Sequence, residues 1–403
     1  MKRKVVIVSA CRTPFGSFGG SLKDISIYDL SAVVMKELIN RTGMDPSEVN
    51  EIFWGVGDTS EAEDVVTPVV ARQAQLKAGI PPEVVSQSID RACCSSSAAI
   101  INAVRLIRSD EVDVAIAGGV QSLSRTPFVL KNARWGMKIG HMNLEDPLFA
   151  LGYKDFAPVA VDAGNVAVEM GVTREMQDKY ACLSQSRYQA ANDKGKFSEQ
   201  IVPVEITVKK KKVIMGGDEF PKPNTTLEFL SKLPTIYGSP TVTAGNAPGL
   251  NDGAAGLLLM SEEKATKMKV PILGYIDDCV SIAMGPHFLA KAPAHAIMKL
   301  LEKNRSTPIA MEKVSILEVN EAFAAVVLTT LRVLAGGDPG VEAELMAKTN
   351  VNGGAIAIGH ANAASGARIV MACLYELRSR GGGMGVASLC GGLAQADAIL
   401  VRQ

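Results

Sequence analysis

A cysteine at the start of a predicted helix is the first candidate for nucleophilic chemistry. Cys93 lies just ahead of Ser95, Ser96 and Ser97, which are predicted to cap that helix. Backbone amides at a helix N-terminus stabilise a thiolate and favour a reactive thiol. A small buried cysteine at a crowded turn is the alternative interpretation, and the adjacent Cys94 leaves the identity of the nucleophile open on local grounds.

A histidine in a glycine-rich turn could activate that thiol. His360 ends the turn of residues 352–360, which leads into a second predicted helix. A Cys–His pair is the usual arrangement for an activated thiolate, although a hydrogen-bonded histidine of the core would give the same pattern. His141, His287 and His295 lie in polar or proline-bounded contexts and are predicted to be surface residues.

Two further strand ends carry groups suited to ligand contact. Cys390 ends a predicted strand against Gly391 and Gly392, and Asn320 ends the strand predicted for residues 314–319. Strand ends of this kind are where α/β proteins build their sites. Packing of the thiol and helix capping by the amide are the alternatives.

The elements that position these groups form a weak internal repeat. A helix is predicted at residues 98–107 with a strand at 112–119, and again a helix at 367–377 with a strand at 385–392. Both helices are apolar nearly all round, so we expect them to be buried. Because helix, turn and strand recur in the same order, the sequence predicts an α/β protein of two similar halves that share a buried helical layer.

This repeat divides the chain into three predicted regions. The N-terminal half takes residues 1–119 plus 249–268, and the C-terminal half takes residues 269–403. Residues 120–248 are predicted to be a loop domain inserted in the first half. The lysine run at 209–212 in that domain is predicted to be a solvated hairpin, with a phosphate-facing patch as the alternative.

Composition argues against several classes of protein. The 403 residues carry 42 Lys+Arg and 42 Asp+Glu, and this zero net charge argues against nucleic-acid binding. No stretch has the roughly 18 apolar residues that a membrane span needs. The seven cysteines form no C-x-x-C pair, which argues against a disulfide framework or a metal site and predicts a cytoplasmic protein with reduced thiols.

At the level of motifs the chain resembles the thiolases over essentially its full length, and among them the bacterial acetyl-CoA acetyltransferases. The motifs that carry this resemblance are Arg12-Thr13-Pro14-Phe15-Gly16, Ser124-Arg125-Thr126-Pro127, Asn132-Ala133-Arg134-Trp135-Gly136, Thr243-Ala244-Gly245-Asn246, Asn251-Asp252-Gly253-Ala254-Ala255, Asn320-Glu321-Ala322-Phe323, Gly353-Gly354-Ala355-Ile356, Gly359-His360 and Cys390-x-Gly392.

The resemblance implies a five-layered αβαβα sandwich of two repeated halves, assembled as a dimer or tetramer, with Trp135 in the tetramerisation segment. It also implies ping-pong acyl transfer. His360 would activate Cys93 to take an acyl group from acyl-CoA, and Cys390 would remove a Cα proton from a second acetyl-CoA. One oxyanion site would consist of His360 and a water held by Asn320, and the other of the backbone N–H groups of Cys93 and Gly392.

The same resemblance implies a set of substrate contacts, with coenzyme A as substrate and product and no separate cofactor. The residues concerned are Gly392, Lys222, Ala244, Pro248 and Phe323. Several positions depart from the family pattern. Asp90 replaces Asn, Cys94 and Ser96 replace glycines, Pro158-Val159 replace His-Met, Lys222 replaces Arg, Pro248 replaces Ser, Ala361 replaces Pro, and Leu393 and Ala394 stand where glycine is common.

Three functions are consistent with this pattern. The first is condensation of two acetyl-CoA to acetoacetyl-CoA and CoA, or the reverse thiolysis. The second is a 3-ketoacyl-CoA thiolase for longer or branched acyl chains, which the loss of the His-Met pair motivates. The third is a non-catalytic acyl-CoA-binding or scaffold protein. A reversible Cys93–Cys390 disulfide that switches activity off is a further hypothesis.

Overall fold

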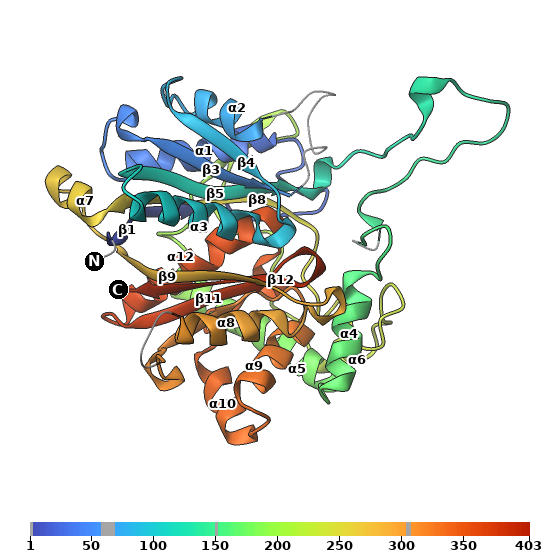
Figure 1. Ribbon diagram of the computed structural model, residues 1–403. Helices are drawn as coiled ribbons and strands as arrows, with labels where there is room; N and C mark the ends of the chain where they lie inside the picture. The colour runs from blue at the N-terminus through green and yellow to red at the C-terminus, as the bar shows by residue number, and fades with distance from the viewer. Residues whose placement is uncertain (1–2, 58–68, 150–151, 304–307) are drawn as a thin grey trace.

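Two buried helices lie between two groups of strands and form the middle of five layers (Figure 1). The computed structural model describes residues 3–57, 69–149, 152–303 and 308–403. The middle layer contains α3 (Ser95–Arg108) and α12 (Ser365–Ser379). The outer helices are α1 (Ile27–Asn40) and α2 (Val70–Lys77) on the first group, and α8 (Ala292–Glu302), α9 (Ala324–Leu334) and α10 (Pro339–Lys348) on the second. The five-layered α/β fold expected from the resemblance is confirmed.

The strands of the two groups join into one sheet, in the order β10-β11-β12-β9-β1-β8-β5-β3-β4, with β2 paired to β8. The first group consists of β1 (Val5–Arg12), β2 (Gly16–Ser17), β3 (Glu51–Val56), β4 (Val85–Ile89), β5 (Val114–Ser122) and β8 (Asn251–Ser261). The second consists of β9 (Gly274–Ala283), β10 (Ile316–Val319), β11 (Met384–Cys390) and β12 (Gln395–Arg402). Antiparallel pairing of β1 with β9, from Val5↔Ile276 to Ile7↔Gly274, joins the groups along one edge.

The predicted strands of the repeat differ from the observed ones at their ends. The strand predicted to stop at Gly119 continues to Ser122, because Gly118 and Gly119 pair with β3 on one side and β8 on the other. The strand predicted to reach Gly392 stops at Cys390. Gly392 instead begins a short 3-10 turn, so the thiol lies where the sheet gives way to a loop.

The two central helices meet at their N-termini with no room for another side chain. An added Cβ at Gly366 would lie 2.6 Å from the Ser97 nitrogen and 2.9 Å from Ser96 Oγ. The Ala367 N–H of α12 donates to Ser96 Oγ of α3 at 3.0 Å. This contact fixes the distance between the start of one helix and the start of the other.

The chain between β5 and β8 folds largely against the second half. It contains α4 (Val159–Glu169), α5 (Arg174–Asp193), β6 (Val204–Val208), β7 (Lys211–Met215) and α6 (Leu227–Ser231). Both α4 and α5 pack on α9 of the second half. Residues 126–149 leave this body as an extended arm (Figure 1).

The hairpin predicted around the lysine run is confirmed. Strands β6 and β7 pair in antiparallel register, and the turn residues Lys209 and Lys210 have φ angles of 47° and 66°. All four lysines are exposed, and Lys212 pairs with Glu205 at 2.7 Å.

Two short helices complete the fold, α7 (Glu262–Met268) and α11 (Ala355–Ile358). In the described part of the chain no helix has the length and apolar character needed to cross a membrane.

We expect Gly366→Ala to lower the free energy of unfolding by about 1–3 kcal/mol, because the new methyl group overpacks the contact between α3 and α12. Gly216→Ala is the matched control, since nothing lies within 4 Å of an added Cβ there and its φ is not in the left-handed region. The free energy of unfolding of Gly216→Ala should stay within about 0.5 kcal/mol of that of the unaltered chain. Urea unfolding of both variants measures the difference, and equal stabilities would contradict the packing argument.

Candidate active site

The turn that presents Cys93 is held by its backbone and by one carboxylate. A 3-10 turn, Ala92–Cys94, precedes α3, and Ala92 has a φ of 50°, a left-handed conformation that costs a non-glycine residue about 1–2 kcal/mol. Asp90 Oδ1 accepts the Ala92 N–H at 2.9 Å. The predicted capping by three serines is wrong, because Cys94 occupies the N-cap position and forms no side-chain capping bond. Ser95 Oγ instead accepts the Arg91 N–H and donates to the Ala92 carbonyl.

The two neighbouring cysteines have different surroundings. Cys94 is fully buried, and its Sγ lies 3.8 Å from the Leu389 carbonyl oxygen. The same sulfur packs against Gly391, where an added Cβ would come within 2.7 Å of it. Cys93 is half-buried, and its Sγ lies 3.2 Å from His360 Nε2. The geometry therefore distinguishes the two thiols that the local sequence left open.

Hydrogen bonds around His360 assign its tautomer. Ser365 Oγ donates to the Ala361 carbonyl at 3.1 Å, so it accepts from the protonated Nδ1 of His360, 2.7 Å away. This leaves the lone pair of Nε2 facing the Cys93 thiol. The His360 N–H also donates to Asn251 Oδ1 at 2.9 Å, and Asn320 Nδ2 lies 3.4 Å from Nε2. His360 is therefore positioned to accept the thiol proton.

Burial keeps both partners neutral before substrate binds. It raises the pKa of Cys93 to about 12, against a smaller lowering by the Cys93 backbone amide. Burial and, to a smaller extent, the positive charge of Arg368 together lower the pKa of His360 to about 3. The helix N-terminus therefore does not outweigh desolvation in the resting site.

The loop after Cys390 packs against the turn that carries Cys93, since an added Cβ at Gly392 would lie 3.2 Å from Ala92 Cβ. Burial raises the pKa of Cys390, and the nearby Cys93 raises it further. Leu393 and Ala394 follow with φ angles of 54° and 58°. Their left-handed conformation explains why glycine is common at these two positions in the proteins that the chain resembles.

Comparison with known proteins agrees with this geometry. The thiolase N-terminal domain matches residues 5–263, and the thiolase C-terminal domain matches residues 270–403. The chain belongs to the thiolase family. It is 37% identical to an acetyl-CoA acetyltransferase of Syntrophomonas wolfei and 39% identical to a beta-ketoadipyl-CoA thiolase of Pseudomonas aeruginosa, covering 100% of each pair of chains. The crystal structure of human mitochondrial 3-ketoacyl-CoA thiolase in complex with CoA is 37% identical, with a TM-score of 0.91 over 100% of this chain and 98% of that one.

Of the substrate contacts predicted for this thiolase, Pro248 lies on a segment that reaches His360. Phe323 is buried at the start of α9, where the next residue's N–H donates to the Asn246 carbonyl. This hydrogen bond holds the loop that contains Ala244 and Asn246 next to the start of α9, and the Ala244 side chain is exposed. Pro248 precedes Leu250, which forms an isolated bridge with His360. Lys222 is farther out, with its Nζ 4.1 Å from the centre of the Phe220 ring.

The other three histidines of the thiolase lie at or near the surface. His141 and His287 are exposed, as predicted, whereas His295 is partly buried. His287 Nδ1 lies 2.9 Å from Asp162 Oδ1. All seven cysteines are free, and the Cys93–Cys390 switch stays a prediction. Across the described residues, no group of three or more His, Cys, Asp or Glu side chains could hold a metal ion.

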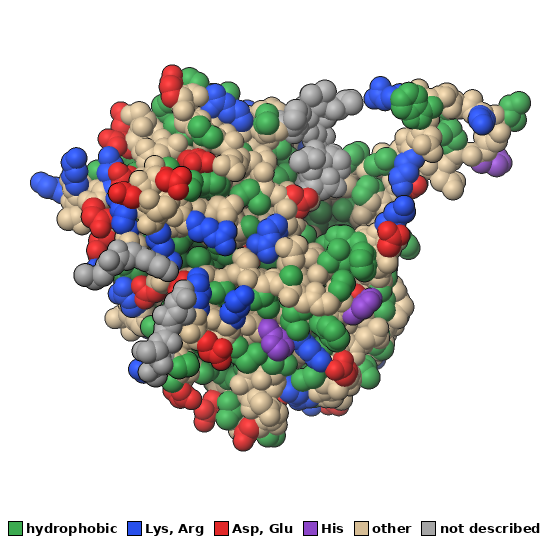
Figure 2. All heavy atoms as spheres, in the orientation of Figure 1, with side chains coloured by type: hydrophobic (Ala, Val, Ile, Leu, Met, Phe, Trp, Pro, Cys, Tyr) green, Lys and Arg blue, Asp and Glu red, His purple; other side chains and the backbone are tan. Residues whose placement is uncertain are grey.

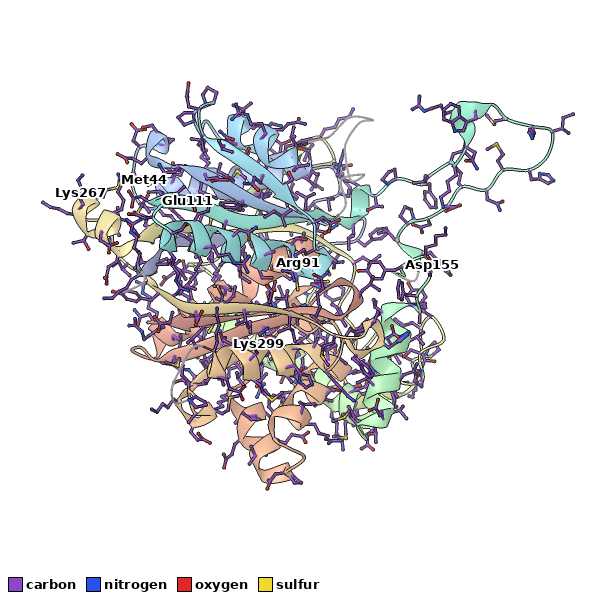
Figure 3. All side chains as sticks on the ribbon, in the orientation of Figure 1. Met44, Arg91, Glu111, Asp155, Lys267 and Lys299 are labelled. Carbon is purple, nitrogen blue, oxygen red and sulfur yellow. The ribbon has the colours of Figure 1, made fainter. Side chains whose placement is uncertain are left out.

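Three residues near the thiols were missed by the sequence reasoning. Ser365 and Arg368 lie on α12, and Arg368 is the one charged residue between Ala367 and Tyr375, a signal that the sequence does carry. Tyr153 comes from the inserted region, which shows no periodic pattern. Its hydroxyl lies against Gly392, where it would collide with an added Cβ. Figure 3 shows Arg91, two residues before Cys93, between the groups of strands, and Asp155 at the root of the arm.

We expect His360→Asn to flatten the acid dependence of stability. The unfolded histidine takes up a proton near its ordinary pKa of 6.5, whereas the folded one does not until about 3. Between these values the unfolded chain binds more protons, so the folded state loses stability as the pH falls. Between pH 6.5 and 5 the unaltered chain should lose about 1–2 kcal/mol more than the variant, by urea unfolding. His141→Asn, on the exposed arm, should behave as the unaltered chain; identical profiles for all three would refute the shift.

Proposed function

We propose that this thiolase condenses two acetyl-CoA to acetoacetyl-CoA and CoA, or runs the reverse thiolysis, through an acyl-enzyme on Cys93. The contact of 3.2 Å between Cys93 Sγ and His360 Nε2 is the observation that carries the proposal. It is the geometry of a nucleophile with its base, and Ser365 orients that base through Nδ1. The acetyltransferase named among the relatives supports the same reaction.

In the first half-reaction His360 Nε2 takes the Cys93 proton as the sulfur attacks the thioester carbonyl of acetyl-CoA. The S–C bond to coenzyme A breaks, and coenzyme A leaves as a thiol with the proton that His360 held. Because imidazole and thiol are both neutral at rest, charge develops only during the attack. The backbone N–H groups of Cys93 and Gly392 stabilise the resulting oxyanion.

In the second half-reaction the Cys390 thiol first gives its proton to His360 and then, as a thiolate, takes a Cα proton from a second acetyl-CoA. The carbanion attacks the thioester on Cys93, forms the new C–C bond and releases the Cys93 sulfur, which takes the proton held by His360. The negative charge on the thioester oxygen of the second substrate is stabilised at a site built from His360 and Asn320. In the reverse direction Cys390 returns the proton. The influence of Cys93 on the pKa of Cys390 supports their action at one site.

The acyl group is short in this proposal because Tyr153 narrows the site. Its hydroxyl lies against Gly392, and its pKa is raised by burial and then by Cys93, Asp90 and Cys390. A large side chain in this position restricts the space beside the thioester carbon. The alternative is a 3-ketoacyl-CoA thiolase for longer or branched chains, which Pro158 and Val159 in place of a His-Met pair favour.

Coenzyme A is the substrate and product in this proposal, and no separate cofactor takes part. Lys222 supplies a cation for its phosphates, and Ala244, Pro248 and Phe323 supply surface for its pantetheine arm. The human relative described in complex with CoA supports this ligand. The cytoplasmic location expected from the cysteines belongs to the same proposal, and localisation of the tagged chain in its own cells would test it.

We further propose that the chain forms a homo-oligomer, a dimer or tetramer, through the arm of residues 126–149. Green apolar side chains gather on this arm in Figure 2. Trp135 is 84% exposed and Met137 is 70% exposed, which is unusual for a surface that stays in water. Sedimentation velocity of the full chain measures the assembly directly, and a monomer at all concentrations would refute it.

We expect acetyl-CoA alone to leave one acetyl group on Cys93. Peptide mass spectrometry after rapid acid quench identifies the modified residue. Cys93→Ser should abolish the adduct, whereas Cys94→Ser, at the buried neighbour, should keep it. A folded chain without any adduct would favour the non-catalytic acyl-CoA-binding or scaffold alternative over an enzyme.

We expect thiolysis to be fastest with a four-carbon 3-ketoacyl-CoA and to fall with each added methylene. Tyr153→Ala should lower the ratio of kcat/KM for the four-carbon substrate to kcat/KM for the eight-carbon substrate by about tenfold. This is the scale on which pockets discriminate by one or two methylenes. Tyr237→Ala, an exposed tyrosine whose ring contacts Phe149 at 5.9 Å, is the control and should change nothing. Faster turnover of the eight-carbon substrate by the unaltered chain would favour the longer-chain alternative.

A further inference from the structure

A buried arginine lies directly behind the Asn320–His360 pair. Arg368, on α12, is 1% exposed, and its Nη2 donates to Asn320 Oδ1 at 3.3 Å. Among the described residues its Nε and Nη1 form no hydrogen bond. The single hydrogen bond of this guanidinium therefore goes to a residue of the site.

That hydrogen bond determines which way the Asn320 amide points. A guanidinium only donates hydrogen bonds, so the amide atom that faces Arg368 must be the carbonyl oxygen. The amide NH2 group is then turned toward His360 Nε2, 3.4 Å away. The unprotonated Nε2 of His360 accepts from the amide NH2 group and favours the same orientation, so Arg368 and His360 hold the Asn320 amide from its two ends.

The positive charge of Arg368 is weakly compensated by the carboxylates around it. Glu318, two residues before Asn320 on β10, is the carboxyl that acts on it most strongly, and burial raises the pKa of Glu318 to about 8. At neutral pH this carboxyl is therefore mainly protonated. Glu321 accepts hydrogen bonds from Tyr180 and Ser184. The other charges that act on Arg368 are Arg12, which opposes it, and Asp218.

We propose that Arg368 is a positioning residue of the thiolase reaction, which holds the Asn320 amide with its NH2 group toward the oxyanion site and places a buried positive charge behind it. This inference rests on the proposed function, because it assigns a purpose to Asn320 in stabilising the second substrate. Negative charge appears on that substrate when Cys390 takes the Cα proton. Because Arg368 bonds Asn320 and not Cys93, its larger effect should be on carbon–carbon bond formation. Its charge also lowers the pKa of His360, so acylation of Cys93 should change by a smaller factor.

The test separates the two half-reactions in Arg368→Met. Acetylation of Cys93, followed by quenched mass spectrometry, should stay within about threefold of the unaltered chain, because Arg368 does not touch the thiol. Condensation and exchange of the acetyl-CoA methyl protons with D2O should fall by about ten- to a hundredfold, the effect of losing a hydrogen bond to a charged group. The KM for acetyl-CoA should change little.

Three variants keep the interpretation from resting on folding alone. Arg368→Lys, which keeps the cation but not the fork of donors, should recover part of the exchange rate. Glu318→Gln, in the same buried cluster, should condense within about threefold of the unaltered chain because it leaves the Asn320 hydrogen bond in place. Arg332→Met removes a half-buried arginine that bonds Glu342 and the Met170 carbonyl. It measures how much activity and stability fall when an arginine outside the site loses its hydrogen bonds. Thermal unfolding of each variant accompanies the kinetics.

The outcomes distinguish this inference from the proposed function. Normal proton exchange in Arg368→Met, or an equal loss in Glu318→Gln, would overturn the positioning role and leave the acyl-enzyme mechanism standing. Loss of acetylation and exchange in the same proportion would also overturn it, since that pattern indicates general damage. Absence of the Cys93 adduct in the unaltered chain would instead overturn the proposed function itself.

Discussion

The close approach of α3 and α12 at their N-termini is the contact on which the geometry of the site depends. Cys93 lies two residues before α3, Ser365 begins α12, and His360 lies five residues before it. The Ser96–Ala367 hydrogen bond and the crowding at Gly366 hold these ends together. Because Cys93 and His360 lie on separate halves of the chain, this packing sets the distance between them, together with the hydrogen bond from the His360 N–H to Asn251 Oδ1. Displacement by one ångström would be enough to separate such a pair.

Much of this arrangement could be predicted from the sequence, because it follows from periodicity and repetition. The apolar helices and the glycine pairs after each strand place Cys93, His360 and Cys390 at corresponding ends of a duplicated fold. The choice between Cys93 and Cys94 could not be predicted locally, since it depends on which side chain faces His360 across the two halves. Tyr153 could not be found either, because its position comes from the path of an irregular insertion. The end of β5 was predicted three residues early because the strand was expected to stop at the Gly118–Gly119 pair, whereas residues 120–122 continue to pair with β8.

The resting site combines neutral side chains with a strained backbone. Burial holds Cys93 as a thiol and His360 as an imidazole, so little of the nucleophile is exposed to stray oxidants before substrate arrives. Ala92, and Leu393 and Ala394 in the loop after Cys390, hold left-handed conformations. Such strain persists only where the surrounding structure fixes it. Here that structure includes the Asp90 carboxylate, which accepts the Ala92 N–H, and the Gly391 N–H, which donates to the Gln395 carbonyl at 2.7 Å.

The pairing of β1 also has a consequence for how the protein is made. Its two neighbours in the sheet are β8 (Asn251–Ser261) and β9 (Gly274–Ala283), which lie far along the chain. On the ribosome, the first strand therefore emerges long before either partner and remains an apolar segment with unpaired backbone groups. Contacts of such sequence separation slow folding and expose aggregation-prone strand edges. The nascent chain thus has a long interval during synthesis in which protection by a chaperone would matter most for β1.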